Sequence, residues 1–326
     1  METTIISKKQ IEKLLTMDAV IAAVEEAYGL FSAQKVTLAP VLSIDVEKHH
    51  GELDIKAGYE QVDDIISVKL ASGFWNNPEN YNLPSGLATI VLVDAKNGVP
   101  LAVMDGGLIT DMRTGAAGAV SAKYLARPNS KRVAIFGTGM QARMQLLALS
   151  EILDIEEVYI WGRNEAKVAS YVQEMEARVK ATFYQGMSAE ECTVNADIII
   201  TTTPSKTPLF EAEWVQPGTH VICIGTDMPG KQEVDPKLFE KAKIVVDSFI
   251  QCQERGEIQH ALTSGLISEV YAEIGEIVLG EKQGRESNQE ITVFDSTGLA
   301  IQDITTAKMI LKLTNDRKDL IKVELI

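Results

Sequence analysis

A glycine-rich turn sets the narrowest limits on the fold of this chain. Residues 137–142 (GTGMQA) directly follow the apolar residues 132–136 (RVAIF) and open a helical pattern. In a G-x-G-x-x-A turn of this kind, Gly137 permits the tight bend, Gly139 lets a pyrophosphate approach the backbone, and Ala142 allows the helix to pack closely on the strand. Free N–H groups at the start of the helix attract the anion. The turn predicts a dinucleotide site with these cofactor contacts: Gly137, Thr138, Gly139, Met140 and Gln141.

The residues around this turn alternate between short apolar runs and helical patterns. Near-continuous apolar strands that alternate with helices predict a parallel sheet covered on both faces. We therefore expect an α/β, doubly wound Rossmann domain over residues 129–298. The expected strands are residues 132–136, 157–161, 196–201, 220–224, 243–247 and 291–295, and the expected helices are residues 140–153 and 165–179.

The first third of the chain has a different pattern. Residues 41–103 form short strand-like pieces broken by Gly, Pro and Asn, and Asn97-Gly98 between two apolar runs predicts a hairpin. The turn-like residues 126–131 (ARPNSK) mark the boundary of this part, which we expect to be a mixed α+β domain over residues 1–128. The expected helices are residues 18–31 and 108–125, and the clearest strands are residues 65–72 and 87–95.

The composition of the chain restricts which partners it can bind and in which cellular compartment it is expected. With 31 Lys and Arg against 46 Asp and Glu, the net charge of −15 would repel nucleic acid and anionic lipid. The longest apolar run, residues 87–93, is too short to cross a bilayer, and METTIISKKQ lacks the apolar core of a secretory signal. Three widely spaced cysteines suit a reducing cytoplasm, and the histidines lack metal-ligand spacing. We expect a cytoplasmic protein with no nucleic-acid partner, no membrane and no metal. The cysteines are Cys192, Cys223 and Cys252, and the histidines are His49, His50, His220 and His260.

The choice of cofactor depends on the end of the second predicted strand. An acidic residue there would bind the adenosine ribose hydroxyls, but residues 161–164 read WGRN. Arg163 can instead pair with a 2′-phosphate, with Asn164 beside it. NADP(H) is therefore favoured and NAD(H) is possible. In the alternative reading, Arg163 stacks on the adenine or faces solvent.

Three basic residues lie in apolar settings of the first domain: Lys56, Lys69 and Arg113. In an acidic protein they can form a positive pocket that suits a substrate carboxylate. Each of them alone is equally consistent with a side chain that extends to the surface.

Asp227 follows the apolar residues 220–224, at the carboxyl end of a predicted strand. Ligands of open α/β sheets bind at these strand ends, so the Asp227 carboxylate can exchange protons with an amine. The alternative is a helix cap before Met228-Pro229.

Taken together, these segments resemble the ornithine cyclodeaminase/mu-crystallin family over roughly residues 5–312. The resemblance implies a substrate-binding and dimerisation domain over residues 1–128, completed by residues 299–326, and a Rossmann domain. It also implies a homodimer and a nicotinamide cofactor. The segments that carry it are residues 67–74 (SVKLASGF), 83–105 (LPSGLATIVLVDAKNGVPLAVMD), 108–128 (LITDMRTGAAGAVSAKYLARP), 133–146 (VAIFGTGMQARMQL), 196–204 (ADIIITTTP), 222–234 (ICIGTDMPGKQEV) and 294–303 (FDSTGLAIQD).

The resemblance also assigns roles to individual residues. Lys69 is similar to the family's active-site lysine, Arg113 to the arginine that clamps the substrate carboxylate, and Asp227 to the aspartate that exchanges protons with the substrate nitrogen. Asp54 falls where ornithine cyclodeaminase has a catalytic glutamate, and Ser85 falls where a threonine approaches the substrate. Further residues that match cofactor contacts are Thr202, Thr203 and Ser296.

The chain departs from the family pattern at two positions. Many members have an arginine after the proline that here is Pro40, but this chain has Val41. Lys56 stands where those members have a methionine. The departures predict a swap in which Lys56 supplies the positive charge that Val41 lacks. Such a swap changes the shape of the pocket, so the substrate need not be the best-known one of the family.

The expected reaction is NAD(P)H-dependent chemistry at the Cα–N bond of an amino or imino acid. We rank reduction of a cyclic ketimine such as Δ1-pyrroline-2-carboxylate to L-proline first, because the NADP preference favours reduction. Ornithine cyclodeaminase, which forms L-proline and ammonia with catalytic NAD, ranks second because Asp54 is shorter than the family's glutamate. A linear amino-acid dehydrogenase ranks third, and a ligand-binding protein of the mu-crystallin type is the alternative outside enzymes.

Overall fold

The computed structural model describes residues 2–314, 317 and 319–325, and it divides into two compact units. Unit 1 contains Met1–Arg113 and Leu299–Ile326, and unit 2 contains Thr114–Gly298. The division therefore lies inside a continuous helix, α4 (Gly107–Leu125), which contributes residues to both units. The turn at residues 126–131, where the sequence suggested the boundary, follows the end of this helix.

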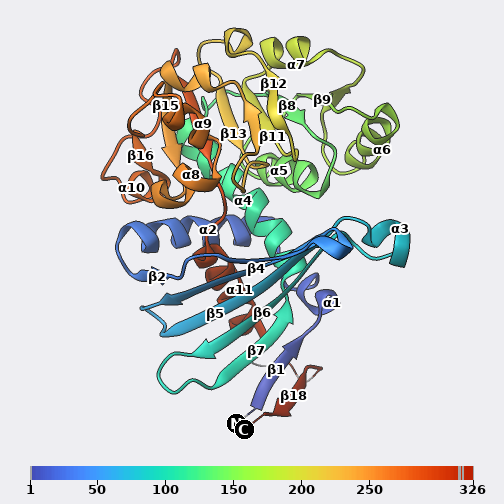
Figure 1. Cartoon of the computed structure of the whole chain (residues 1–326), viewed down its shortest axis with the longest axis vertical. Helices are drawn as coiled ribbons and strands as arrows, with labels where there is room; N and C mark the ends of the chain where they lie inside the picture. The colour runs from blue at the N-terminus through green and yellow to red at the C-terminus, as the bar shows by residue number, and fades with distance from the viewer. Residues whose placement is uncertain (1, 315–316, 318, 326) are drawn as a thin grey trace. The chain divides into compact units, whose positions relative to one another are not determined.

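Unit 1 is built on a mixed sheet in which the described residues form eight strands (Figure 1). The order is β18-β1-β7-β6-β5-β4-β2, with β3 paired to β4. Strands β2 to β7 pair antiparallel, whereas β1 runs parallel to β7, so the two ends of the chain meet at one edge through the pairing of β1 with β18. The strands are β1 (Glu2–Ile6), β2 (Val36–Leu38), β3 (Leu42–Val46), β4 (Gly51–Glu60), β5 (Ile65–Phe74), β6 (Gly86–Asp94), β7 (Pro100–Asp105) and β18 (Ile321–Glu324).

Helix α11 connects the carboxyl-terminal segment to the sheet of unit 1. It packs against α2 and against strands β4, β5 and β6, and most of its side chains are buried. The predicted helix over residues 18–31 and the predicted hairpin at Asn97-Gly98 are confirmed, the latter as the turn between β6 and β7. The helical segments of unit 1 are α1 (Lys8–Ile11), α2 (Met17–Ser32), η1 (Glu47–His49), α3 (Asn77–Tyr81) and α11 (Ala300–Thr314), together with the first part of α4.

Unit 2, all of whose residues are described, contains a fully parallel sheet of eight strands in the order β10-β9-β8-β11-β13-β17-β15-β16. The first five strands in this list have the Rossmann order 3-2-1-4-5, and β17, the last strand of the sheet along the chain, takes the sixth place. This arrangement confirms the predicted α/β domain. Strands β12 and β14 form a separate pair. The strands are β8 (Arg132–Phe136), β9 (Glu157–Trp161), β10 (Thr182–Tyr184), β11 (Ile198–Thr201), β12 (Lys206–Phe210), β13 (His220–Cys223), β14 (Gln232–Val234), β15 (Ala242–Val246), β16 (Ala272–Glu273) and β17 (Ile291–Asp295).

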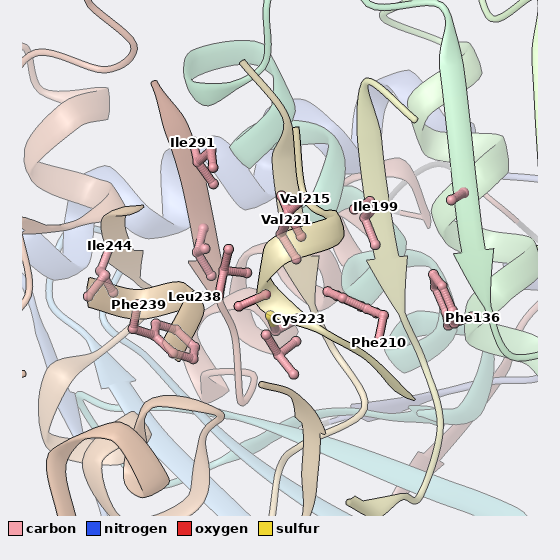
Figure 2. Packing of buried hydrophobic residues seen from close by; sticks show 14 of the residues in the cluster. Phe136, Ile199, Phe210, Val215, Val221, Cys223, Leu238, Phe239, Ile244 and Ile291 are labelled. Atoms are coloured by element: carbon pink, nitrogen blue, oxygen red, sulfur yellow. The ribbon is translucent and has the colours of Figure 1, made fainter. Parts of the chain in front are cut away.

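The central strands of unit 2 are buried on both faces, because successive residues of β11, β13 and β17 are all inaccessible to solvent. Figure 2 shows one side of this core, where Phe136, Ile199 and Val221 from neighbouring strands pack with Phe210 and Leu238. The helical segments are α5 (Met140–Ser150), α6 (Glu165–Met175), α7 (Ala189–Asn195), η2 (Ala212–Trp214), η3 (Pro236–Glu240), α8 (Phe249–Arg255), α9 (Ile258–Thr263) and α10 (Ile274–Val278).

Several polar residues in unit 2 serve the core. His220 lies wholly inside it, between the hydroxyl groups of Ser121 (3.1 Å) and Thr292 (2.9 Å). Burial lowers the pKa of His220 to about 3, so its ring is neutral at physiological pH. The three cysteines are buried thiols that form no disulfide.

Among the described residues, no helix combines the length and apolarity that crossing a membrane would require.

Candidate functional site

The glycine-rich turn connects β8 to α5 at the switch point of the parallel sheet. Gly137 has a φ of +120°, and a Cβ there would lie 2.5 Å from the Thr202 hydroxyl oxygen, so only glycine fits. Gly139 is the N-cap of α5, and a Cβ there would meet no atom within 4 Å. Open space thus lies directly over the backbone where a pyrophosphate would approach, at the helix end that attracts anions. These residues fit a dinucleotide.

Arg143, which the sequence analysis did not single out, ties this turn together. Its guanidinium donates to the carbonyl oxygens of Thr138 (2.6 Å) and Gly139 (3.0 Å) and pairs with Glu174 (2.7 Å). The same group lies 5.1 Å from the centre of the Tyr171 ring. Because both carbonyl groups are held by one cation, the N–H groups of the turn keep a fixed direction. The only sign of this role in the sequence was the basic residue at the position directly after the glycine-rich motif at residues 137–142.

The strand beside β8, β11, brings two predicted cofactor contacts to the turn. The Thr202 hydroxyl and N–H both donate to the Phe136 carbonyl, next to Gly137. The Thr203 N–H donates to Glu233 at 2.5 Å. Ser296 also lies at the carboxyl end of a strand in this sheet, but it is buried and its hydroxyl donates to Asp247 at 2.9 Å. A cofactor contact of Ser296 stays a prediction.

At the carboxyl end of β9 a pocket of about 430 Å³ opens beside Trp161 and Gly162, lined also by Gln185 and Met187. The position and apolar wall of this pocket suit an adenine ring. Arg163, which follows Gly162, is exposed, and Asn164 caps α6 by accepting the Lys167 N–H at 3.0 Å. The side-chain oxygen of Asn164 is therefore already engaged in the fold.

Asp227 lies four residues after the end of β13, in a loop of unit 2. Its side chain is 49% exposed, and its carboxylate pairs with the Lys231 ammonium at 2.6 Å. Arg255 donates to the backbone carbonyl of the same residue at 3.0 Å. No helix begins at Met228-Pro229, both of which are described, so the helix-cap alternative is wrong. The accessible carboxylate can exchange protons with a ligand.

In unit 1, two buried cations share one buried carboxylate. Lys69 on β5 lies 2.6 Å from Asp303 Oδ2, and Arg113 on α4 donates to Asp303 Oδ1 at 3.1 Å. Gln302 accepts from Arg113 at 3.2 Å and donates to the Tyr28 hydroxyl. Lys69 also reaches the Thr110 hydroxyl at 3.3 Å. We call Lys69, Arg113, Gln302 and Asp303 the unit 1 cation cluster.

The charges in this cluster shift one another's protonation. Burial lowers the pKa of Lys69 to about 7; the Asp303 charge raises it, and the charges of Arg113 and Lys56 lower it further. Burial alone would raise the pKa of Asp303, but Lys69 and Arg113 hold it below its ordinary value. Asp303 is therefore ionised at neutral pH, and Lys69 is close to its midpoint.

The strand register places a further cation beside the cluster. Lys56 on β4 is directly opposite Lys69 on β5, so the two side chains project from the same face of the sheet. Asp54 is on this face too, and its carboxylate accepts from the Ser43 hydroxyl at 2.5 Å. Two like charges at directly opposed positions repel each other, which favours an anion between them.

Ser85, by contrast, is not near the cluster along the sheet. It precedes β6, five residues before Ile90, the residue paired with Lys69. At about 3.3 Å per residue this separation is roughly 17 Å. Its substrate contact stays a prediction.

Asp303 and Gln302 were not predicted as site residues from the sequence. Both lie in residues 294–303, a segment that carried the family resemblance, yet neither received a role. An acidic residue inside the apolar pattern of α11 was the available signal, because a buried carboxylate requires a charged partner.

One group of carboxylates in the described part of the chain has a metal-like arrangement: Glu211, Glu213 and Asp235. Glu211 and Glu213 are exposed. The Asp235 oxygens already accept the N–H groups of Ala212 and Lys237. These bonds explain the position of Asp235 without a cation.

A Rossmann-type sheet with an open glycine-rich turn, in a chain that also carries a buried lysine on a second sheet and a buried arginine on a helix, defines a dinucleotide-dependent oxidoreductase class. The chain belongs to the ornithine cyclodeaminase/mu-crystallin family, whose sequence profile matches residues 1–318. This confirms the resemblance found in the sequence.

Relatives in this family cover nearly the whole chain. An alanine dehydrogenase from Archaeoglobus fulgidus is 42% identical over 313 residues, which are 95% of this chain and 94% of that protein. The solved structure of an archaeal alanine dehydrogenase dimer with bound NAD matches with a TM-score of 0.93 and 40% identity over the full length of both chains. A Δ1-pyrroline-2-carboxylate reductase from Thermococcus litoralis, solved with NADH and L-proline, has a TM-score of 0.91 and 37% identity, covering 96% of this chain and 97% of that one. With such relatives, the chain is an enzyme of this oxidoreductase class.

Proposed function

We propose that this enzyme is an NAD(P)H-dependent reductase of α-imino acids, with Δ1-pyrroline-2-carboxylate as its substrate and L-proline as its product. The observation that carries the proposal is the unit 1 cation cluster, in which Lys69 and Arg113 surround the single carboxylate of Asp303. Lys56, opposite Lys69, adds another cation to the same face. A positive, largely buried surface of this kind suits a small carboxylate ligand.

Within unit 1, the substrate carboxylate binds to Arg113 and Lys56, and Lys69 polarises the carboxylate or the nitrogen. Asp303 keeps the Arg113 guanidinium in one orientation, so that its remaining N–H groups point in a fixed direction. Rigid positioning of this kind can lower a barrier by several kcal/mol.

Hydride transfer to the α-carbon is the chemistry that a bound nicotinamide supplies. As the C=N bond is reduced, Asp227 delivers a proton to the substrate nitrogen. Lys231, whose ammonium lies 2.6 Å from the Asp227 carboxylate, holds that side chain in place, and the half-exposed carboxyl group of Asp227 regains its proton from solvent.

The cofactor is NADP(H) in preference to NAD(H). Residues 161–164 at the end of β9 contain no carboxylate that would bind the 2′-hydroxyl, the first carboxylate lining the proposed adenine pocket being Glu165 on α6. The exposed Arg163 directly follows Gly162, which lines that pocket. A guanidinium at this position can make charge-assisted hydrogen bonds to a 2′-phosphate. The related structures contain NAD or NADH, so the preference rests on Arg163 alone.

A second candidate is oxidative deamination of alanine, favoured by the 42% identity to the alanine dehydrogenase. It uses the same carboxylate contacts and the same proton exchange, in the opposite direction. Cyclodeamination of ornithine is less well supported, because Asp54 is engaged by the Ser43 hydroxyl and is one methylene shorter than the family's glutamate.

We further propose a homodimer formed through the other face of the unit 1 sheet. Successive strand residues point to opposite faces, so the residues that flank Lys56 and Lys69, and the apolar residues that share their face through the strand register, project away from the cation cluster. Four of them are unusually exposed: Leu42 (57%), Ile44 (46%), Leu70 (39%) and Leu87 (43%). The register places them in two adjacent rows, which form a contiguous apolar surface. The dimeric state of the related alanine dehydrogenase supports this assignment.

The test is a comparison of substrates by absorbance of the reduced nicotinamide, with NADPH and NADH in parallel. Δ1-Pyrroline-2-carboxylate, pyruvate with ammonia, and ornithine are each supplied to the wild-type chain, and released ammonia is assayed with ornithine. Rapid NADPH loss with the cyclic imine supports the proposal. Faster turnover with pyruvate and ammonia would favour the alanine dehydrogenase reading, and ammonia from ornithine without net NADPH change would identify a cyclodeaminase.

A further inference from the structure

Unit 2 contains a buried carboxyl group that the proposed mechanism does not use. Glu233 on β14 is fully buried. Its Oε1 accepts the Thr203 N–H at 2.5 Å, whereas Oε2 has no hydrogen-bond partner in the described part of the chain. A buried carboxyl group with one unsatisfied oxygen is costly, so its presence calls for a physical reason.

A second buried acid, Glu257, holds the backbone at Glu233 in place. The Glu257 carboxylate accepts the N–H of Glu233 (2.9 Å) and the N–H of Val234 (2.7 Å). Glu257 is itself fully buried and precedes α9. Strand β14, which pairs with β12 outside the main sheet, is therefore also held by the Glu257 side chain.

At the carboxyl group of Glu233, the loop that follows β11 and the loop that follows β13 come into close contact. A Cβ on Gly225 would lie 2.4 Å from Glu233 Oε2, and also 2.4 Å from the Thr203 carbonyl oxygen and 2.5 Å from its nitrogen. Gly225 is thus wedged between Thr203 and Glu233, and only a hydrogen atom fits there. Asp227 follows two residues later.

We infer that Glu233 is a positioning residue for the proposed reaction: its carboxyl group locks the Thr203 loop against the Gly225–Asp227 loop and so fixes where the Asp227 carboxylate lies relative to the cofactor end of the sheet. This inference rests on the proposed function, because it gives Glu233 a part in placing the proton donor. Burial, together with the neighbouring Glu257 charge, raises the pKa of Glu233 to about 8, so the group is mainly protonated at neutral pH. A glutamine is then a close mimic.

The experiment compares Glu233→Gln with Glu233→Asp in the full chain. Glutamine keeps an oxygen for the Thr203 N–H, so kcat should stay within about fivefold of the wild type. Aspartate keeps the carboxyl group but withdraws it by one methylene, and a displacement of about 1 Å at a reacting group can reduce kcat about 100-fold. We expect that loss in kcat for Δ1-pyrroline-2-carboxylate reduction, with the KM of the imine and the Kd of NADPH nearly unchanged.

The matched control is Asp197→Asn, at the opposite end of β11. Asp197 is also a buried carboxylate, but it pairs with Arg127 and Arg132, away from the glycine-rich turn. This control should lower Tm without lowering kcat. If Glu233→Asp yields no folded protein, Gly225→Ala disturbs the same junction from the other side and should show the same loss in kcat.

The outcomes separate the two claims. Wild-type protein that reduces no imino acid would overturn the proposed function, and this inference with it. An active wild type with a Glu233→Asp variant of unchanged kcat would overturn the inference alone. So would an equal loss in Glu233→Gln and Glu233→Asp, because glutamine keeps both the reach and the acceptor oxygen for the Thr203 N–H and should therefore preserve the positioning.

Discussion

Lys69 Nζ lies 2.6 Å from Asp303 Oδ2, and both side chains are almost completely buried. Their separation in the sequence is 234 residues (303 − 69), so the contact brings a middle strand of the unit 1 sheet against the carboxyl-terminal helix. A buried pair of this kind seldom adds much net stability, because desolvation offsets the attraction. The ion pair instead serves to hold two cations close together, because Asp303 also binds Arg113.

Replacing Asp303 with asparagine should be strongly destabilising. The change preserves the shape but leaves Lys69 and Arg113 buried without their counter-charge, which typically costs about 3–5 kcal/mol. Urea denaturation of Asp303→Asn and of wild type measures the loss. Asp319→Asn, which removes an exposed carboxylate paired with Arg317, is the control and should leave the midpoint nearly unchanged. Equal midpoints for Asp303→Asn and wild type would show that the pair has no structural role.

The pH dependence of catalysis should report on Lys69. Because burial lowers its pKa to about 7, the free enzyme carries the ammonium below that pH and the neutral amine above it. The cation attracts the substrate carboxylate, so kcat/KM for Δ1-pyrroline-2-carboxylate should fall as the pH rises above about 7. In Lys69→Arg the guanidinium stays charged, and the descending limb near this pH should disappear from whatever activity remains. A rise in wild-type kcat/KM above pH 7 would instead mean that the neutral amine acts as a base.

The sequence predicted the frame of unit 2 better than the details of either site. Residues 132–136 and 157–161 are strands β8 and β9 to the residue, because long apolar runs beside a glycine-rich turn allow few alternatives. The strands β10, β12, β14 and β16 are only two to five residues long and carry too little periodicity to be seen. The pairing of β1 with β18 joins the two ends of the chain, which local patterns cannot reveal.

For the candidate site, the sequence allowed us to predict which basic residues take part, but not which residues they pair with. Lys69 and Arg113 stood out as basic residues in apolar segments, yet their common partner Asp303 is in a helix about 190 residues further along from Arg113. The Lys56–Lys69 alignment depends on the register of β4 and β5, which the sequence does not specify. Similarly, Glu233 looked like an ordinary acidic residue, because its burial arises only when β14 meets the loops that follow β11 and β13.

Asp227→Asn should separate proton transfer from binding. Asparagine retains the size of the side chain but cannot deliver a proton, so kcat should fall by about 10²–10⁴-fold. The Kd of NADPH, measured by quenching of protein fluorescence, should change less than about twofold, since uniform binding is not affected. Lys231→Met removes only the ion-pair partner and should have a smaller effect. Full activity of Asp227→Asn would exclude the proton-transfer role.

The proposed dimer can be tested by adding charge to the exposed apolar face. The double variant Leu42→Asp and Ile44→Asp places two carboxylates on β3, and desolvating them at an interface is unfavourable. Light scattering should then give the mass of one chain, 35.6 kDa, where the wild type gives twice that value. Ile250→Asp, at an exposed apolar position on α8 of unit 2, is the matched control and should remain dimeric. A dimeric double variant would place the interface elsewhere.

Arg163→Ala tests the cofactor preference. If the guanidinium binds the 2′-phosphate, its removal eliminates charge-assisted hydrogen bonds of about 1.5–3 kcal/mol, which correspond to a roughly 10- to 100-fold rise in the Kd of NADPH. NADH has no 2′-phosphate, so its Kd should change less than about twofold on the same reasoning. Lys167→Ala, which removes an exposed cation one turn further along α6, should affect both cofactors weakly and equally. Isothermal titration of both cofactors against the three proteins distinguishes the outcomes. Equal losses of NADPH and NADH affinity in Arg163→Ala would mean that the side chain stacks on the adenine, and the enzyme would then have no structural basis for preferring NADP(H).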